Sequence, residues 1–165
     1  MPNIHYRPAT MTDLHAICYL GNEVNRLHQQ VWPNLFAEVS ELERDAAHWR
    51  YAIGNAGCFV ASNEDGVIGF VTGQICRDES PMLVNFNFCR IGTICVATAY
   101  RGLGIGKQLM LNIERWAQAE NASEVRLNVF SFNQAAIQLY QELGFDIRSM
   151  AMAKPLTTSA ELAIQ

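Results

Sequence analysis

The residues most able to carry chemistry gather in a glycine-rich segment in the second half of the chain. It reads Val96-Ala-Thr-Ala-Tyr-Arg-Gly-Leu-Gly-Ile-Gly-Lys-Gln-Leu109, with three alternating glycines between two cations. An apolar strand pattern precedes the segment and a helical pattern follows it. Because a helix N-terminus offers unpaired backbone N–H groups and a partial positive charge, the segment predicts a site for an anion such as a phosphate.

The turn also lacks the residues that normally occupy the start of a helix. Between Arg101 and Gln108 there is no Ser, Thr, Asp or Asn to cap the backbone, and no acid in the first turn. The glycines let an outside group approach the main chain without meeting a Cβ atom. Apolar residues recur downstream at helical spacing and predict one buried face, which consists of Ile105, Leu109, Met110, Ile113, Trp116 and Ala117. The sequence therefore predicts a preformed anion cradle on a firmly packed helix.

The spacing excludes two well-known phosphate loops. A Walker loop needs a glycine five positions before its Gly-Lys pair and a Ser or Thr after it, whereas here Arg101 precedes Gly106-Lys107 and Gln108 follows. The dinucleotide fingerprint G-x-G-x-x-G also fails, because these glycines run G-x-G-x-G and lie outside a first β-α-β unit. A glycine turn without a ligand and a site for some other nucleotide both stay open at this point.

The overall composition fits one well-packed globular domain, with 165 residues of which 50% are hydrophobic and 17% charged. A net charge of -4 argues against general nucleic-acid binding, which needs a basic surface. The N-terminus lacks a signal-peptide pattern, and no apolar run approaches the roughly 18 residues of a membrane span, so we expect a cytoplasmic protein. Five cysteines without C-x-x-C spacing predict reduced thiols, with neither a disulfide framework nor a metal site.

Hydrophobic periodicity predicts an α/β domain with one mixed sheet and helices on both of its faces. The predicted elements are strand 4–7, helices 12–27 and 38–53, strands 58–62, 67–75 and 86–96, the helix after the glycine turn, strand 124–130, helix 133–143 and strand 145–156. Their order, β-α-α-β-β-β-α-β-α-β, makes the front half antiparallel and the rear half a β-α-β unit. We expect a single domain over residues 1–156 and a flexible C-terminal tail over 157–165.

Two motifs, in this order along the chain, resemble those of a known family. The first is Arg101-x-x-Gly104-x-Gly106, preceded by Ile94-Cys-Val96, and the second is Asn133-x-x-Ala136-x-x-Leu139-Tyr140-x-x-x-Gly144-Phe145. With the beginning Tyr6-Arg-Pro-Ala-Thr10, they are similar to the GCN5-related N-acetyltransferases (GNAT family), and the resemblance covers nearly the whole chain. It implies transfer of an acetyl group from acetyl-CoA to a primary amine of a small molecule or peptide. A non-catalytic acyl-CoA-binding regulatory module is the alternative.

The resemblance also implies how acetyl-CoA is bound. Its pyrophosphate would bind the backbone of the glycine turn and the charges beside it, at Arg101, Gly102, Leu103, Gly104, Ile105, Gly106 and Lys107. The pantetheine arm would insert between splayed strands and bond to the backbone at Ile94, Cys95 and Val96, like a missing strand. Backbone donors near Ile94 and Cys95 would then polarise the thioester carbonyl.

Two downstream residues match family positions with roles in the reaction. Asn133 would help to hold the cofactor arm, although an Asn at a helix start also has an ordinary capping role. The Tyr140 hydroxyl would protonate the departing thiolate, and the amine would attack the thioester directly, without an acyl-enzyme. Cys95 is disfavoured as a nucleophile, because no His lies near it in the sequence and its strand is apolar.

The chain departs from the common pattern of the family at the general base. Many members carry an acid on the strand before the glycine turn, where this chain has Gly92 and Thr93. Glu23, Glu38 and His28 could act through water, but each also has a simple interpretation as a solvated or structural residue, and no base is assigned.

The acceptor amine is expected to be selected by two loops, 28–36 and 78–87. They flank the cleft that the resemblance implies, and loops vary without disturbing a sheet. Members of the family often dimerise, which leaves a homodimer open here, and we expect no nucleic-acid, membrane or metal partner. The sequence does not name the amine.

Overall fold

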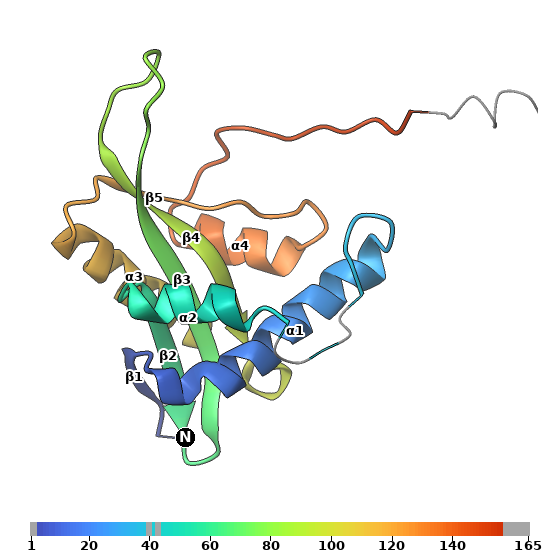
Figure 1. The fold of residues 1–165 in the computed structure, drawn as a ribbon, viewed down its shortest axis with the longest axis vertical. Coiled ribbons are helices and arrows are strands. Elements are labelled where there is room, and N and C mark those ends of the chain that lie inside the picture. Colours follow the sequence, from blue (N-terminus) through green and yellow to red (C-terminus); the bar gives the residue numbers. More distant parts are fainter. Residues whose placement is uncertain (1–2, 39–40, 42–43, 157–165) are drawn as a thin grey trace, which may run out of the picture. The chain divides into compact units, whose positions relative to one another are not determined.

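The computed structural model describes residues 3–38, 41 and 44–156 of the chain (Figure 1). The chain divides into two compact units, Met1–Val129 and Phe130–Gln165. The first unit contains the sheet and the glycine turn, and the second contains the last helix. Residues 157–165, for which we predict a flexible tail, lie outside the described part of the chain.

The first unit is built on a mixed sheet whose strands lie side by side in sequence order. The strands are β1 (His5–Pro8), β2 (Cys58–Asn63), β3 (Gly66–Arg77), β4 (Asn87–Val96) and β5 (Glu124–Arg126). The pairs from β1 to β4 are antiparallel, whereas β4 and β5 are parallel. A parallel pair needs a crossover connection, which the helix between β4 and β5 supplies. The predicted mixed α/β class is therefore confirmed.

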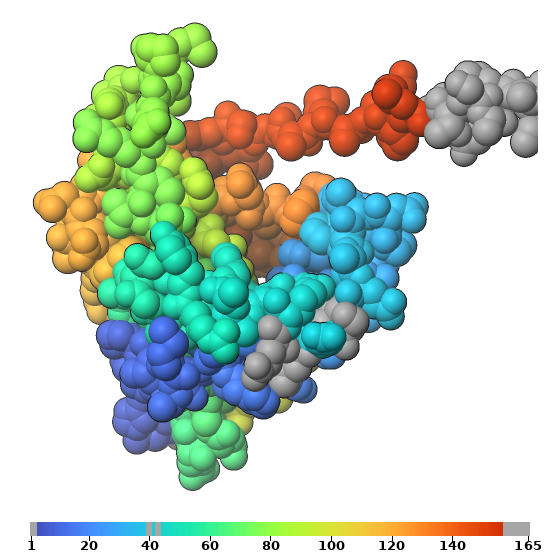
Figure 2. Space-filling model, in the orientation of Figure 1, coloured from blue at the N-terminus to red at the C-terminus, as the bar shows by residue number. Residues whose placement is uncertain are grey.

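Helices cover both faces of this sheet, as predicted (Figure 1). One face carries α1 (Leu14–Val31) and α2 (Ala46–Gly54), which Figure 2 shows in blue to teal on the near side. Trp49 of α2 packs edge-on against Phe70 of β3, with 5.3 Å between the ring centroids. The opposite face carries α3 (Ile105–Ala119), whose Leu109 and Ile113 fill the space above two glycines of β3. None of the described helices is long and apolar enough to cross a bilayer.

The buried face of α3 agrees with the helical spacing of its apolar residues. Its buried residues are Ile105, Leu109, Met110, Ile113 and Ala117, and Trp116 is half-buried. Because the first of them is also the first residue of the helix, packing anchors the N-terminus of α3 as well as its middle.

A polar cluster attaches the segment before the glycine turn to the β2–β3 hairpin. Asn63 Oδ1 accepts the backbone N–H of Asp65 (2.9 Å), which closes the Asp-Gly turn that the sequence predicts. The Tyr100 hydroxyl donates to Asp65 Oδ2 (2.7 Å), and the Asn63 side-chain amide donates to the Tyr100 oxygen (3.2 Å). Tyr100 ends the short helix η2 (Thr98–Tyr100), so these bonds fix where the chain enters the glycine turn.

The start of α1 is held by a buried carboxylate. Asp13 Oδ2 and Oδ1 accept hydrogen bonds from Arg7 Nη1 (2.7 Å) and Nη2 (2.8 Å), and Oδ2 also accepts the Thr10 backbone N–H (2.8 Å). The Arg7 guanidinium, more than the other contacts, holds the pKa of Asp13 below its ordinary value. The bond to Thr10 is half of a capping box at the start of the short helix η1 (Met11–Asp13), which leads into α1.

Replacing Asp13 by asparagine is expected to lower the free energy of unfolding by about 1 to 2 kcal/mol at neutral pH. The amide keeps one acceptor but loses the paired charge, and Arg7 is only partly shielded from water. Because the folded pKa of Asp13 lies below the unfolded one, its stabilisation is complete above the unfolded pKa and is lost as the pH falls through the folded pKa. Urea unfolding of both proteins over a range of pH measures this, and a difference that does not shrink toward acid would contradict it.

The middle of β4 contains the bulge for which Gly92 is a signal. The register between β3 and β4 shifts between Val71 and Gly73, opposite Ile91 to Ile94. At this point the Thr93 N–H donates to the Thr72 hydroxyl (3.0 Å). A bulge increases the local twist of the strand and re-aims the residues that follow it.

Several predicted boundaries are wrong. The second helix begins at Ala46 rather than at residue 38, and α1 runs to Val31, so the first part of the predicted loop 28–36 is helical. The strand expected over 124–130 stops at Arg126, and the described residues 145–156 contain no strand. A strand is stabilised by pairing and packing more than by propensity, so an apolar run without a paired neighbour remains extended chain.

Candidate functional site

The glycine turn has the backbone shape that its glycines permit. Gly102 and Gly104 have φ angles of 78° and 77°, in the left-handed region that side chains with a Cβ rarely adopt. A Cβ atom placed on either glycine would meet nothing within 4 Å. The space beside the turn is therefore open to a group from outside.

The N-terminus of α3 carries no side-chain cap within the described residues. Gly104 is the N-cap residue, no side chain bonds to the first turn, and no acid lies in that turn. The first intrahelical bond runs from the Gln108 N–H to the Gly104 carbonyl (3.1 Å). The three preceding N–H groups, those of Ile105, Gly106 and Lys107, lie ahead of the helical ladder and point along the helix dipole. This is the donor set that binds a phosphate.

The end of β4 presents backbone groups at an open edge of the sheet. β5 pairs with β4 only from Phe88 to Arg90, and within the described chain no strand continues along the rest of β4. The Ala97 N–H donates to the Ile68 carbonyl of β3 (2.9 Å), and N–H groups alternate in direction along a strand. The backbone N–H groups of Ile94 and Val96 therefore face away from β3, whereas that of Cys95 faces β3.

Arg101 is attached to the same edge. Its Nε donates to the Val96 carbonyl (2.9 Å), so the guanidinium lies across the end of β4. The side chain is exposed, and its remaining N–H groups are available to a ligand beside the strand.

Cys95 has the environment of a structural thiol. It is 4% exposed, its Sγ donates to the Leu20 carbonyl of α1 (3.4 Å), and burial raises its pKa to about 12. A thiol is nucleophilic only as the thiolate, so Cys95 is protonated and inert at neutral pH. Cys58, Cys76 and Cys89 are likewise thiols outside any disulfide.

The second unit contains the other two predicted site residues, one at the N-cap of α4 (Gln134–Glu142) and one within it. Asn133 caps this helix, because its Oδ1 accepts the Ala136 N–H (3.2 Å). Tyr140 is buried, which raises its pKa to about 12, and its ring meets that of Phe145 at 5.8 Å. The Phe145 N–H donates to the Tyr140 carbonyl (2.9 Å) and the Gly144 N–H to that of Gln141 (3.0 Å), which ends the helix in a Schellman motif.

The structure thus brings the predicted residues together in two groups. The first group lies in the first unit and joins the end of β4 to the glycine turn, with Ile94, Cys95, Val96, Arg101, Gly102, Leu103, Gly104, Ile105, Gly106 and Lys107. The second group lies in the second unit, with Asn133 at the N-cap of α4 and Tyr140 within this helix.

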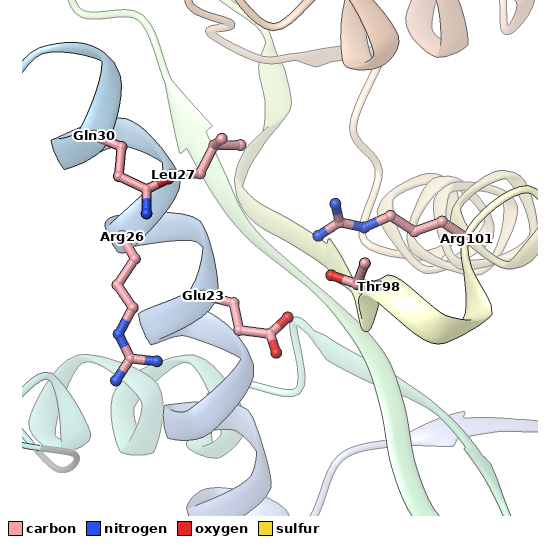
Figure 3. Close-up of a pocket in the computed structure, with 6 residues that line it drawn as sticks. All are labelled: Glu23, Arg26, Leu27, Gln30, Thr98 and Arg101. Carbon is pink, nitrogen blue, oxygen red and sulfur yellow. The ribbon is translucent and has the colours of Figure 1, made fainter.

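A cavity in the first unit contains residues that the motifs do not include. It has a volume of about 250 Å³, lies between α1 and η2, and is lined by Glu23, Arg26, Leu27, Gln30, Thr98 and Arg101 (Figure 3). The Glu23 Oε2 atom is buried and has no hydrogen-bond partner within the described chain. Sequence reasoning names Glu23 among several acids but misses Thr98. One signal in the sequence could have pointed to Glu23. It lies three residues after the buried Leu20 on an amphipathic helix, and therefore on the side of the helix that faces the protein.

The two loops expected to select the acceptor contribute little to this cavity. Only Gln30 of residues 28–36 lines it, and it belongs to α1 rather than to a loop. The other loop is the tip of the β3–β4 hairpin, green in Figure 2, where Met82 and Val84 are exposed. Its base is attached to the sheet by the ion pair between Arg126 and Asp78 (2.6 Å).

Comparison with known proteins places these features in a family. The model of the acetyltransferase (GNAT) family matches residues 22–145, which is more than half of the chain. An N-alpha-acetyltransferase from Sulfurisphaera tokodaii is 34% identical over 146 residues, which cover 84% of this chain and 78% of the relative. Mouse N-acetyltransferase 8F1 is 27% identical over 72% of this chain, but the chain spans only about half (53%) of the mouse protein.

Solved structures show the same fold. An aminoglycoside N-acetyltransferase in complex with CoA superposes with a TM-score of 0.69 at 19% sequence identity, over 96% of this chain and 97% of that protein. At this level of identity the likeness concerns the arrangement of the sheet and its helices.

Proposed function

Because the chain belongs to the acetyltransferase (GNAT) family, we propose that it transfers an acetyl group from acetyl-CoA to a primary amine of a small molecule or peptide. The observation that carries this proposal is the uncapped N-terminus of α3, which follows two left-handed glycines and lies beside the open end of β4. The N-terminus of α3 suits a pyrophosphate, and the open end of β4 suits an extended chain with amide groups.

The glycine turn and the end of β4 would each bind a different part of acetyl-CoA. The N–H groups at the start of α3 would bind the pyrophosphate, with Lys107 and Arg101 adding positive charge. The outward N–H groups of Ile94 and Val96 would bind the pantetheine arm and the thioester carbonyl, where negative charge develops during attack. Cys95 would contribute packing, because its N–H faces β3 and its thiol is bonded to α1.

Tyr140 would supply the proton for the leaving group. With its pKa raised to about 12 by burial, the hydroxyl stays protonated at neutral pH and has a proton to donate to a departing thiolate. Asn133, whose side chain caps α4, would keep this helix in place and contact the cofactor arm with its remaining donor.

The relatives support the two parts of this proposal to different degrees. The aminoglycoside N-acetyltransferase was solved with CoA, which supports acetyl-CoA as the cosubstrate. The name of the archaeal relative favours an α-amine as the acceptor, and the name of the solved structure favours an aminoglycoside. The free cysteines support a reducing, cytoplasmic compartment.

The proposal is tested by acetyl-CoA binding and turnover. Acetyl-CoA at 100 times its Kd is expected to stabilise the folded protein by about 2.7 kcal/mol, seen as a rise in Tm. Release of free CoA is then followed with a panel of amino acids, peptides, polyamines and aminoglycosides. Turnover with one of these amines confirms the transferase. Binding without turnover across the panel identifies the non-catalytic acyl-CoA-binding module, and the absence of any stabilisation contradicts both functions.

A further inference from the structure

The cavity between α1 and η2 is lined by a carboxylate, one of whose oxygens has no hydrogen-bond partner within the described chain. In Figure 3 the side chains of Glu23, Thr98 and Arg101 point toward one another from opposite walls, whereas Arg26 points away along α1. Glu23 Oε2 is out of contact with water and accepts no hydrogen bond within the described chain. Because the chain itself covers Oε2, a donor from outside would reach Glu23 at the part of its half-buried side chain that faces the cavity.

This carboxylate lies beside the end of β4. The Cys95 thiol donates to the carbonyl of Leu20, which is one helical turn before Glu23 on α1. The negative charge of Glu23 contributes to raising the pKa of Cys95, after the larger effect of burial. Thr98 and Arg101, on the opposite wall, follow β4 directly in the chain. Glu23 therefore faces the part of the strand where the proposed function positions the thioester.

The charges of the cavity restrict what it can accept. Glu23 is the one carboxylate of its lining and the Arg101 guanidinium faces it, so an acceptor with several positive charges would find a single negative partner there. A single ammonium group would pair with the carboxylate of Glu23, and a neutral hydrogen-bonding neighbour of that group would suit the Thr98 hydroxyl. The α-amine of a peptide chain has this combination, because an amide carbonyl follows its ammonium group.

We propose that this cavity is the acceptor site, that it takes the α-amine of a peptide, and that Glu23 is the general base. This inference rests on the proposed function. The ammonium group gives one proton to the carboxylate of Glu23, and the neutral nitrogen then forms its bond to the acetyl carbon as the carbon–sulfur bond breaks. A second proton leaves the nitrogen for solvent, and the departing thiolate takes one proton up. The balance is one ammonium and one thioester converted into one amide, one thiol and one proton, which Glu23 releases to solvent.

The test compares the full-length chain with its Glu23→Gln variant, using a neutral hexapeptide amide with a free N-terminal alanine. At pH 7 the variant is expected to lose about 100-fold in kcat/KM, which is the lower end of the range for general-base catalysis. The loss should shrink toward pH 9, because the solvent then supplies unprotonated amine. The affinity for acetyl-CoA should not change. Glu64→Gln, which removes the same charge from an exposed turn, is the matched control and should match the parent chain.

Peptide binding gives a second measurement that does not depend on turnover. Calorimetry of the hexapeptide with the CoA complex at pH 7 is expected to show about tenfold weaker binding for Glu23→Gln than for the parent chain. The inference is overturned if the two proteins bind the hexapeptide equally or if the parent chain does not bind it. It is also overturned if the loss of kcat/KM is the same at every pH, or if the parent chain prefers spermine to the peptide. Failure of the parent chain to bind acetyl-CoA overturns the proposed function instead.

Discussion

Replacing Tyr140 by phenylalanine is expected to lower kcat about 1000-fold while leaving the affinity for acetyl-CoA within about threefold of the parent chain. The phenyl ring keeps the apolar surface that packs against Phe145, so the fold of α4 should be retained. The hydroxyl alone is removed, and with it the proton that the proposed function assigns to the leaving thiolate. Single-turnover measurement of acetyl transfer, at saturating acetyl-CoA and amine, isolates the affected step.

The pH dependence gives this prediction a second observable. Because burial raises the pKa of Tyr140 to about 12, its hydroxyl should remain protonated throughout the range in which the protein is assayed. The parent chain is therefore expected to show no fall in activity from ionisation of Tyr140 below about pH 11. Tyr19→Phe, which removes the hydroxyl of a half-exposed tyrosine on α1, is the control and should behave as the parent chain. A Tyr140→Phe variant with parental turnover would exclude the acid role.

Changing Gly104 to aspartate is expected to weaken CoA binding about 100-fold without unfolding the protein. The new carboxylate would lie at the N-terminus of α3, where it competes with a phosphate for the same N–H groups and repels it. The fold should tolerate the change, because Asp is among the residues that adopt left-handed backbone and no atom within 4 Å obstructs a Cβ there. We expect a free energy of unfolding within about 1 kcal/mol of the parent value.

Gly104→Asn is the matched variant, because it has nearly the same shape and no charge. It is expected to weaken CoA binding about tenfold, so the remaining tenfold difference between the two variants reports the charge. Isothermal titration with CoA measures both affinities, and urea unfolding verifies the fold. If the aspartate variant binds CoA as tightly as the parent chain, the glycine turn is not the phosphate site.

Local patterns were enough to predict the parts of the site that consist of neighbouring residues. The glycine turn, its uncapped helix and the buried face from Ile105 to Ala117 follow from turn chemistry and from the 3.6-residue period. The Asp-Gly hairpin and the bulge at Gly92 are likewise signals within a few residues. Such features depend on backbone conformation over short distances, which the sequence specifies directly.

Local sequence patterns could not predict the features that depend on residues far apart in the chain. The run 145–156 has the composition of a strand, but in the described structure no neighbour pairs with it, and β5 stops at Arg126 for the same reason. Glu23 is one of several acids in the sequence, and helical periodicity alone could not distinguish it from a solvated residue. Only the packing of α1 over the end of β4 buries its carboxylate opposite Thr98 and Arg101. Its proposed role arises from tertiary contact, because burial and charge at a site are set by every element that surrounds it.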